Sequence, residues 1–206
     1  MAADNVSKCQ LVRRPWIWLL RVRHRKGYGV HSPSAYAFLR GVVYESSTYY
    51  AYAELDRLHP WWQRWLHLYP VRCRRLLFRL ANFVHPATIL ILGERPIEEA
   101  YMAAAVPSAK IEKLCPISPI GPISPRGPID LLFVARESLP SLTLPLPPMA
   151  ENGMLIVEGI HTDAAARDRW RAIQQDPQTV ITYDLYTYGI VFFDSTKYPQ
   201  HYIVNF

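Results

Sequence analysis

The chain has 206 residues, half of them hydrophobic, which is long enough to bury a core as a single domain. Its net charge is +6, but the charge is unevenly distributed. Residues 1–85 are basic, with 14 lysines and arginines against 4 acidic residues, and the remainder is mildly acidic. The three cysteines lie too far apart for a metal site or a disulfide framework. We therefore expect no bound metal. The apolar run at 16–20 is too short for a signal or a membrane span, so we expect a cytoplasmic protein.

Residues 1–85 are predicted to form a helical, basic extension that packs on a core of residues 86–206, so that the two make one structural unit. Within "GYGVHSPS", Tyr28, His31 and Ser32 are residue types that suit the substrate side of a pocket. The same stretch suits a helix entry, in which Ser32 caps the helix and a proline takes its first turn. Both interpretations remain open at this point.

A helix is predicted to end before Pro86, with Leu76, Leu80 and Phe83 on one face. Arginines on this helix, with three tryptophans just before it (Trp61, Trp62 and Trp65), are typical of a surface that binds phosphates and stacks bases. The alternative is that the tryptophans are buried and the arginines form a solvated face or a surface for an acidic protein partner.

The stretch "TILILGERPIEEAYMAAA" at 88–105 predicts a buried strand, a turn at Gly93 and a helix that begins at Pro96 and ends at Pro107. Strand–turn–helix junctions of this kind hold nucleotide-like cofactors in α/β proteins. The next proline-rich repeat, "PISPIGPISPRGPID" at 116–130, excludes a regular helix. It suits a stiff connector or a ligand of the PxxP type.

The remaining pattern predicts an α/β sheet with an antiparallel hairpin near its C-terminal end. Strands are expected at 110–115, 130–135, 153–160 and 200–206, with the hairpin within 179–194. A helix capped by Thr162 or Asp163 precedes the hairpin. The expected core comprises Leu90, Leu92, Leu132, Phe133, Leu155, Val157, Trp170, Ile190 and Phe192.

Several stretches together resemble a bacterial family of class I S-adenosylmethionine-dependent methyltransferase-like proteins, from about residue 24 onwards. They are "GYGVHSPSAYAFL", "RRLLFRLANFVHPATILILG", "IDLLFV", "LIVEGIH", "YDLYTYGIVFF" and "QHYIVNF". The resemblance implies a Rossmann-like class I methyltransferase fold with a mostly parallel sheet, here with a trimmed middle. It also implies a cofactor site near Gly93 and Glu94, and a reactive side that includes Glu158 and His161.

The sequence departs from the family pattern at several of the positions that would hold the cofactor. Where the pattern resembles E-L-G-x-x-x-G, this chain has Ile91 for the acid and bulky residues after Gly93. The acid that would hold the ribose is absent after "KIEKL", and Ala135 stands where an aspartate is expected. Glycines matter there because the backbone must approach the cofactor closely.

Three functions therefore remain in view. The first is a methyltransferase-like pseudoenzyme with weak or absent S-adenosylmethionine binding, which works as a binding or scaffold protein. The second is an active methyltransferase on an unknown acceptor. The third is a nucleic-acid-binding protein that uses the basic front half.

Overall fold

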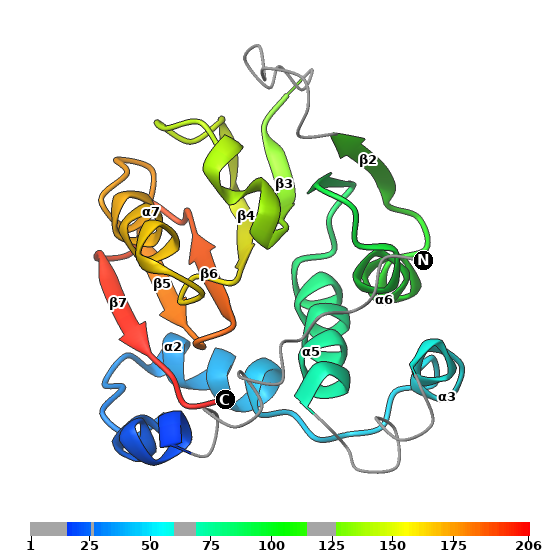
Figure 1. Cartoon of the computed structure of the whole chain (residues 1–206), viewed down its shortest axis with the longest axis horizontal. Helices are drawn as coiled ribbons and strands as arrows, with labels where there is room; N and C mark the ends of the chain where they lie inside the picture. The colour runs from blue at the N-terminus through cyan, green and yellow to red at the C-terminus, as the bar shows by residue number, and fades with distance from the viewer. Residues whose placement is uncertain (1–15, 26, 60–68, 115–126) are drawn as a thin grey trace.

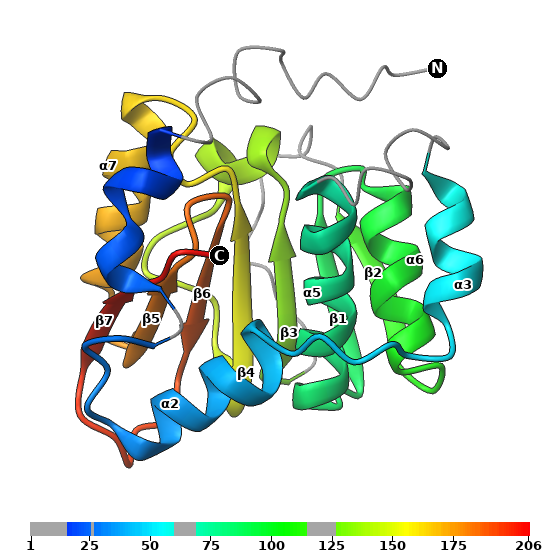
Figure 2. The same ribbon diagram turned by 90° about the horizontal axis from the view of Figure 1, so that it is seen from below.

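The computed structural model describes residues 16–25, 27–59, 69–114 and 127–206. The described part of the chain forms one seven-stranded sheet in the order β2-β1-β3-β4-β6-β5-β7 (Figure 1). The strands are β1 (Thr88–Leu92), β2 (Lys110–Leu114), β3 (Ile129–Val134), β4 (Met149–Glu158), β5 (Ile181–Asp184), β6 (Tyr188–Phe192) and β7 (Gln200–Ile203). Figure 2 shows them side by side, with β2 at one end of the sheet and β7 at the other.

The strand directions confirm the predicted mixed sheet. Strands β2, β1, β3 and β4 pair in parallel, as buried strands joined by crossovers do. Strand β6 is antiparallel both to β4 and to β5, which makes β5 and β6 the expected hairpin. Strand β7 then pairs in parallel with β5 at the edge of the sheet.

Local signals in the sequence account for where the helices begin. Helix α6 (Pro96–Ala105) has Pro96 in its first turn, where the missing N–H costs nothing. Helix α7 (Ala164–Gln174) is capped by Asp163, whose carboxylate accepts the N–H of Ala166 at 2.8 Å. Helix α2 (Pro33–Phe38) is capped by Ser32 and continues into the π-helical turn η2 (Leu39–Val43).

Alternating strand residues fill a core on each face of the sheet. On one face, Ile91, Phe133 and Ile156 pack against α2, η2 and α5 (Tyr69–Val84). On the other face, strand residues such as Leu92 pack against α7 and the short 3-10 helix η4 (Arg136–Ser141).

All but one of the expected core residues are buried, the exception being Phe192, which is partly exposed. Helix α5 buries Leu76 and Leu80 as predicted, but its Phe83 is 49 % exposed. Phe83 lies at the border of the core, with its ring centroid 5.4 Å from that of Phe38 and 6.3 Å from that of Phe192. The i+7 position has therefore rotated to the edge of the apolar face.

A third cluster joins α5, α6 and the short helix α3 (Tyr52–Leu55), and it contains buried polar groups. Arg74 donates from Nε to Glu98 at 2.8 Å, and its Nη1 lies 3.0 Å from Nδ1 of His59. The other nitrogen of His59 lies 3.2 Å from the hydroxyl of Tyr101, which donates to Asp56 at 2.7 Å. The hydrogen bonds run without a break from the arginine to the aspartate, so this polar chain is tolerated inside the protein.

The segment 16–25 lies beside the C-terminal residues of the chain. Residues 16–20 are helical, and the 3-10 turn η1 (Val22–His24) follows them. Asn205 donates from its side chain to the carbonyl of Trp18 at 3.1 Å and from its backbone to the carbonyl of His24 at 3.0 Å. Both views show this dark-blue segment next to β7 and the C-terminus (Figures 1 and 2).

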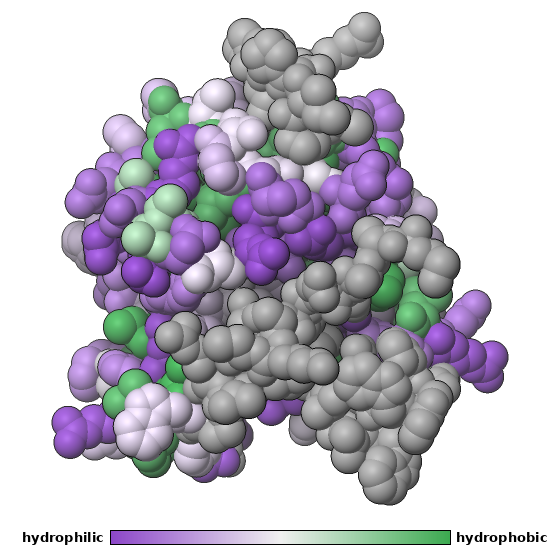
Figure 3. All heavy atoms as spheres, in the orientation of Figure 1, coloured by the Kyte–Doolittle hydropathy of each residue, from purple (hydrophilic) through white to green (hydrophobic). Residues whose placement is uncertain are grey.

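The anchored segment presents large apolar side chains to solvent. Trp16 is 67 % exposed and Leu20 is 69 % exposed. Figure 3 shows hydrophobic groups next to strongly hydrophilic ones in this corner of the molecule. No helix in the described part of the chain has the length and hydropathy needed to cross a membrane. Trp61, Trp62, Trp65 and most of the proline-rich repeat lie outside the described residues.

Candidate functional site

The topology defines one place in the sheet where a ligand is most expected. From β1 the chain crosses through α6 to β2 on one side, and the later strand β3 pairs with β1 on the other side. Ligands of open α/β sheets bind in the crevice at such a switch point, outside the carboxyl ends of the strands. Here that crevice lies between Gly93, which follows β1, and Ala135, which follows β3.

An arginine side chain occupies this crevice. Arg95 donates from Nη1 and Nη2 to the two carboxylate oxygens of Glu137 at 2.7 and 2.6 Å. Its Nε donates to Oε2 of Glu158 at 2.9 Å, so one guanidinium joins the ends of β1, β3 and β4. The planar fork of arginine suits the two-bond contact to a carboxylate. We call these three residues the Arg95 bridge.

The backbone below the Arg95 bridge is crowded as well. Gly93 has φ of +102°, and a Cβ built on it would lie 2.6 Å from Oγ of Ser138 and 2.7 Å from Cβ of Ala135. Ser138 itself is fully buried, and its hydroxyl has no hydrogen-bond partner among the residues that the structure describes. The glycine is therefore needed for close packing of this turn against η4.

Glu158, which we expected on the reactive side, is part of the Arg95 bridge. Its Oε2 also accepts the backbone N–H of Arg136 at 3.2 Å. Burial raises the pKa of the Glu158 carboxyl above its ordinary value, although the charge of Arg95 opposes the shift. The group is thus a partly desolvated carboxyl held by an arginine, and a general base at this position would first have to leave that ion pair.

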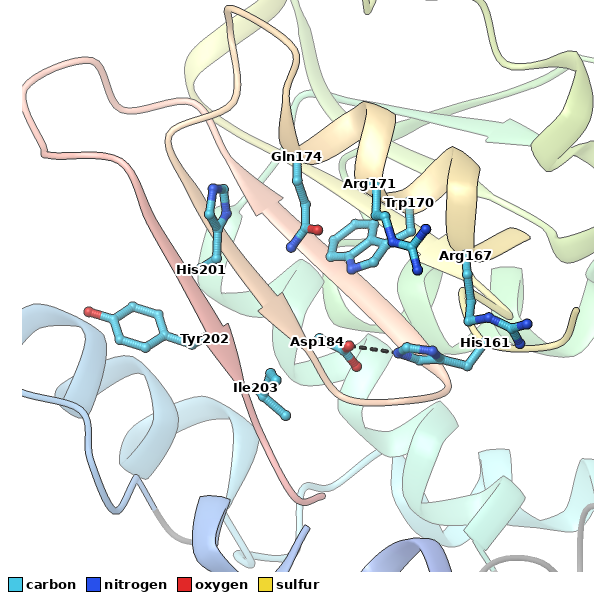
Figure 4. A pocket seen from close by; sticks show the side chains of 9 residues that line it. All are labelled: His161, Arg167, Trp170, Arg171, Gln174, Asp184, His201, Tyr202 and Ile203. Carbon is cyan, nitrogen blue, oxygen red and sulfur yellow. Dashed lines mark hydrogen bonds and ion pairs between the residues drawn. The ribbon is translucent and has the colours of Figure 1, made fainter. Parts of the chain in front are cut away.

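His161 belongs to a different hydrogen-bonded group from Glu158. Its Nε2 lies 2.6 Å from Oδ2 of Asp184 (Figure 4). Arg21 binds the same carboxylate from Nη1 at 2.9 Å, and the ring of His161 stacks on Tyr186 with centroids 5.1 Å apart. Because Asp184 accepts, Nε2 of His161 carries the proton in this pair. The two residues predicted to act together therefore have separate partners.

The stability of the protein at acidic pH depends on the carboxyl group of Asp184. Burial raises the pKa of Asp184, but hydrogen bonds from His161 and Arg21 outweigh it and lower the pKa from 3.8 to about 2. The resulting stabilisation is present above pH 3.8 and is lost as the pH falls towards 2. Asp184→Asn removes this titration. Between pH 3.8 and about 2, the free energy of unfolding of the unaltered chain should therefore fall by about 2 kcal/mol more than that of the variant.

Urea unfolding at a series of pH values measures this difference. Asp168→Asn is the control, because Asp168 forms an exposed ion pair with Arg171 on α7 that contributes little to stability. If the free energy of unfolding fell equally with decreasing pH for Asp184→Asn and for the unaltered chain, the assignment would be contradicted.

The other predicted site residues are exposed or serve the fold. Glu94 is exposed, and its carbonyl accepts a hydrogen bond from Arg95 at 3.0 Å. Tyr28 is 80 % exposed, His31 is exposed, and Ser32 caps α2 by accepting the N–H of Ala35 at 3.4 Å. Within the described ranges, no group of three or more histidine, cysteine, aspartate or glutamate side chains is placed to hold a metal ion.

Sequence reasoning missed four residues of these two groups. Glu137 and Asp184 gave no local signal, and Arg95 was noted only as bulk in place of a glycine. Arg21 belongs to the basic front half, and its partner Asp184 lies 163 residues further along the chain. One signal was available in the sequence, because the chain has many more arginines than lysines. A surface that only has to be soluble could use lysine equally well, so the arginines indicate specific contacts with carboxylates.

No protein-family model matches the sequence, and no curated protein matches it. Among solved structures, the chain is similar to the S-adenosylhomocysteine-bound methyltransferase PaMTH1 of Podospora anserina. The two are 14 % identical with a TM-score of 0.43, and the match covers 79 % of this chain and 96 % of that one.

Proposed function

We propose that this chain is a methyltransferase-like protein whose cofactor crevice is closed and which works as a binding or scaffold protein. The observation that carries the proposal is the Arg95 bridge, which fills the switch point between β1 and β3 with a paired guanidinium. A nucleoside cofactor at this crevice would have to displace Arg95 from both Glu137 and Glu158. The alternative is an active S-adenosylmethionine-dependent methyltransferase in which the arginine swings away.

The ends of the neighbouring strands also support a closed site. Ile91, at the position of the family's acid, is 1 % exposed and packs in the core, so it offers no hydrogen bond. Strand β2 ends at Leu114, and its Glu112 pairs with Lys110 at 2.7 Å. Glu112 is the only carboxylate of β2, and it stands in the middle of the strand rather than at the end where ribose hydroxyls would need an acceptor.

We expect calorimetric titration with S-adenosylmethionine and S-adenosylhomocysteine to show no binding by the unaltered chain at about 1 mM ligand, a concentration that corresponds to only about −4 kcal/mol. Arg95→Gly removes the guanidinium from the crevice and tests whether the bridge alone excludes the cofactor. A gain of binding by this variant would assign the exclusion to Arg95.

Arg40→Gly is the matched control, because Arg40 is an exposed arginine of η2 that does not belong to the bridge. If Arg95→Gly and Arg40→Gly are both silent, the loss of binding is distributed over several positions, and the pseudoenzyme proposal stands. Micromolar binding by the unaltered chain, about −8 kcal/mol, would overturn the proposal and revive the enzyme.

The surface that we propose for binding is the anchored segment 16–25. Arg23 and Arg25 are exposed next to Trp16 and Leu20, and an apolar patch rimmed by charge is typical of an interaction site. An acidic protein, in the cytoplasm that the cysteine usage predicts, suits this combination of arginines and exposed apolar area. Nucleic acid is the second candidate partner, and retardation of duplex DNA in a native gel would favour it.

A further inference from the structure

A second hollow lies away from the switch point, between α7 and the strands β5 and β7. It has a volume of about 280 Å³, and Figure 4 shows the side chains that line it. Trp170 forms part of its wall and is held in place by close packing, since a Cβ on Gly189 would lie 2.5 Å from the Trp170 ring. The residues of the Arg95 bridge are not among its lining residues.

The helix side of this pocket presents two guanidinium groups one turn apart. Arg167 and Arg171 both line the pocket from α7 (Figure 4). The side chain of Arg167 is exposed, and its guanidinium makes no hydrogen bond or ion pair with any residue that the structure describes, although its charge helps to lower the pKa of Asp163. Arg171 pairs with Asp168 at 2.8 Å, but their side chains are 67 % and 69 % exposed. Such a pair contributes little, so Arg171 can exchange this partner for a ligand.

The acidic residue of the pocket is already compensated. Asp184 lies at the end of β5, and its carboxylate accepts from Arg21, from His161 and from the backbone N–H of Tyr186, the last at 2.8 Å. These donors use the lone pairs of Asp184, and Arg21 balances its charge. The charge of Asp184 therefore does not cancel that of Arg167.

The strand side adds a further donor. His201 of β7 lines the pocket, and its Nδ1 lies 2.9 Å from the hydroxyl of Thr182. That hydroxyl accepts from Nε2 of Gln174 at 3.2 Å, so its own proton can go to Nδ1 of His201. With Nδ1 accepting, Nε2 of His201 is the ring nitrogen that donates. Tyr202 and Ile203, beside His201, supply carbon atoms to the same wall.

We propose that this pocket binds a phosphate monoester, with Arg167 and Arg171 on the phosphate and the β7 side on the ester substituent. A tetrahedral phosphate dianion can accept hydrogen bonds from two guanidinium groups at once, whereas a single guanidinium satisfies a planar carboxylate. The volume exceeds what a bare phosphate needs, which leaves room for the organic group. This site is independent of the closed cofactor crevice.

Titration of the full chain with phenyl phosphate and with inorganic phosphate, at constant ionic strength, tests the proposal by calorimetry and by amide NMR shifts. We expect saturable binding of both, tighter for phenyl phosphate, with shifts confined to α7, β7 and the residues around His161. Arg167→Gln should weaken binding about tenfold, the effect of losing one charge-assisted contact. The Arg167→Gln/Arg171→Gln double variant should abolish binding.

Arg40→Gln is the matched control, because it removes one exposed positive charge outside the pocket and should leave the affinity unchanged. Equal weakening by Arg40→Gln and Arg167→Gln would mean non-specific attraction and would overturn the site. Absence of saturation at tens of millimolar ligand, or shifts centred on another surface, would overturn it as well. Equal affinity for the two ligands would reject the ester part of the proposal.

Discussion

Replacing Glu98 with alanine should lower the free energy of unfolding by about 3–5 kcal/mol. The side chains of Arg74 and Glu98 are only 6 % and 7 % exposed, and they meet at 2.8 Å between α5 and α6. Removing the carboxylate takes the charge of Glu98 away from the buried guanidinium of Arg74, which costs far more than the loss of an ordinary contact. Urea unfolding followed by circular dichroism measures the change.

Glu99 provides the control on the same helix. It pairs with Lys113 at 2.8 Å, but the two side chains are 23 % and 57 % exposed, so Glu99→Ala should cost less than about 1 kcal/mol. Replacing both Arg74 and Glu98 with leucine or methionine should recover much of the stability that Glu98→Ala loses, because no unpaired charge then remains. If Glu98→Ala were no more harmful than Glu99→Ala, the buried pair would not have the role assigned to it.

Replacing Gly93 with alanine should cost about 2–4 kcal/mol, the sum of backbone strain at positive φ and overpacking. The φ of +102° disfavours any residue with a Cβ, and that atom would meet Ser138 and Ala135 at 2.6 and 2.7 Å. Ala135 cannot rotate away, so the end of β3 or the start of η4 must shift. Thermal or urea unfolding gives the loss directly.

Gly29 separates the two contributions. It also has positive φ, at +83°, but nothing lies within 4 Å of the Cβ that alanine would add. Gly29→Ala should therefore show the backbone strain alone, about 1–2 kcal/mol. Equal costs at Gly29 and Gly93 would show that η4 yields easily, and that the crevice is less tightly closed than its contacts indicate.

The sheet was largely predictable because its signals are local. Apolar runs such as "TILIL" have the length of buried strands, and Pro96 and Asp163 mark helix starts through chemistry confined to a few residues. The exposure of Phe83 was not predictable in this way. Phe83 lies at the edge of the apolar face of α5, and how far such a residue is buried depends on the neighbouring helix α2, whose Phe38 it contacts.

The candidate site was predictable only in part, because its contacts join distant positions. Gly93 and the bulk after it indicated a departure from an open turn, but the pairing of Arg95 with Glu137 and Glu158 spans 42 and 63 residues. The spacing of residues within one helix or strand does not indicate which distant residue a side chain will contact. His161 likewise looked like a companion of Glu158, three residues away, until the fold placed Asp184 beside it.

The anchoring of segment 16–25 has a consequence for the order of events during synthesis. Trp18 and Arg21 leave the ribosome early, but Asn205 and Asp184, which hold them, lie 187 and 163 residues later. Contacts of such sequence separation form late, after the strands that carry one partner have assembled. Until Asp184 and Asn205 have been synthesised and placed by the sheet, the apolar side chains of this segment are therefore available to chaperones.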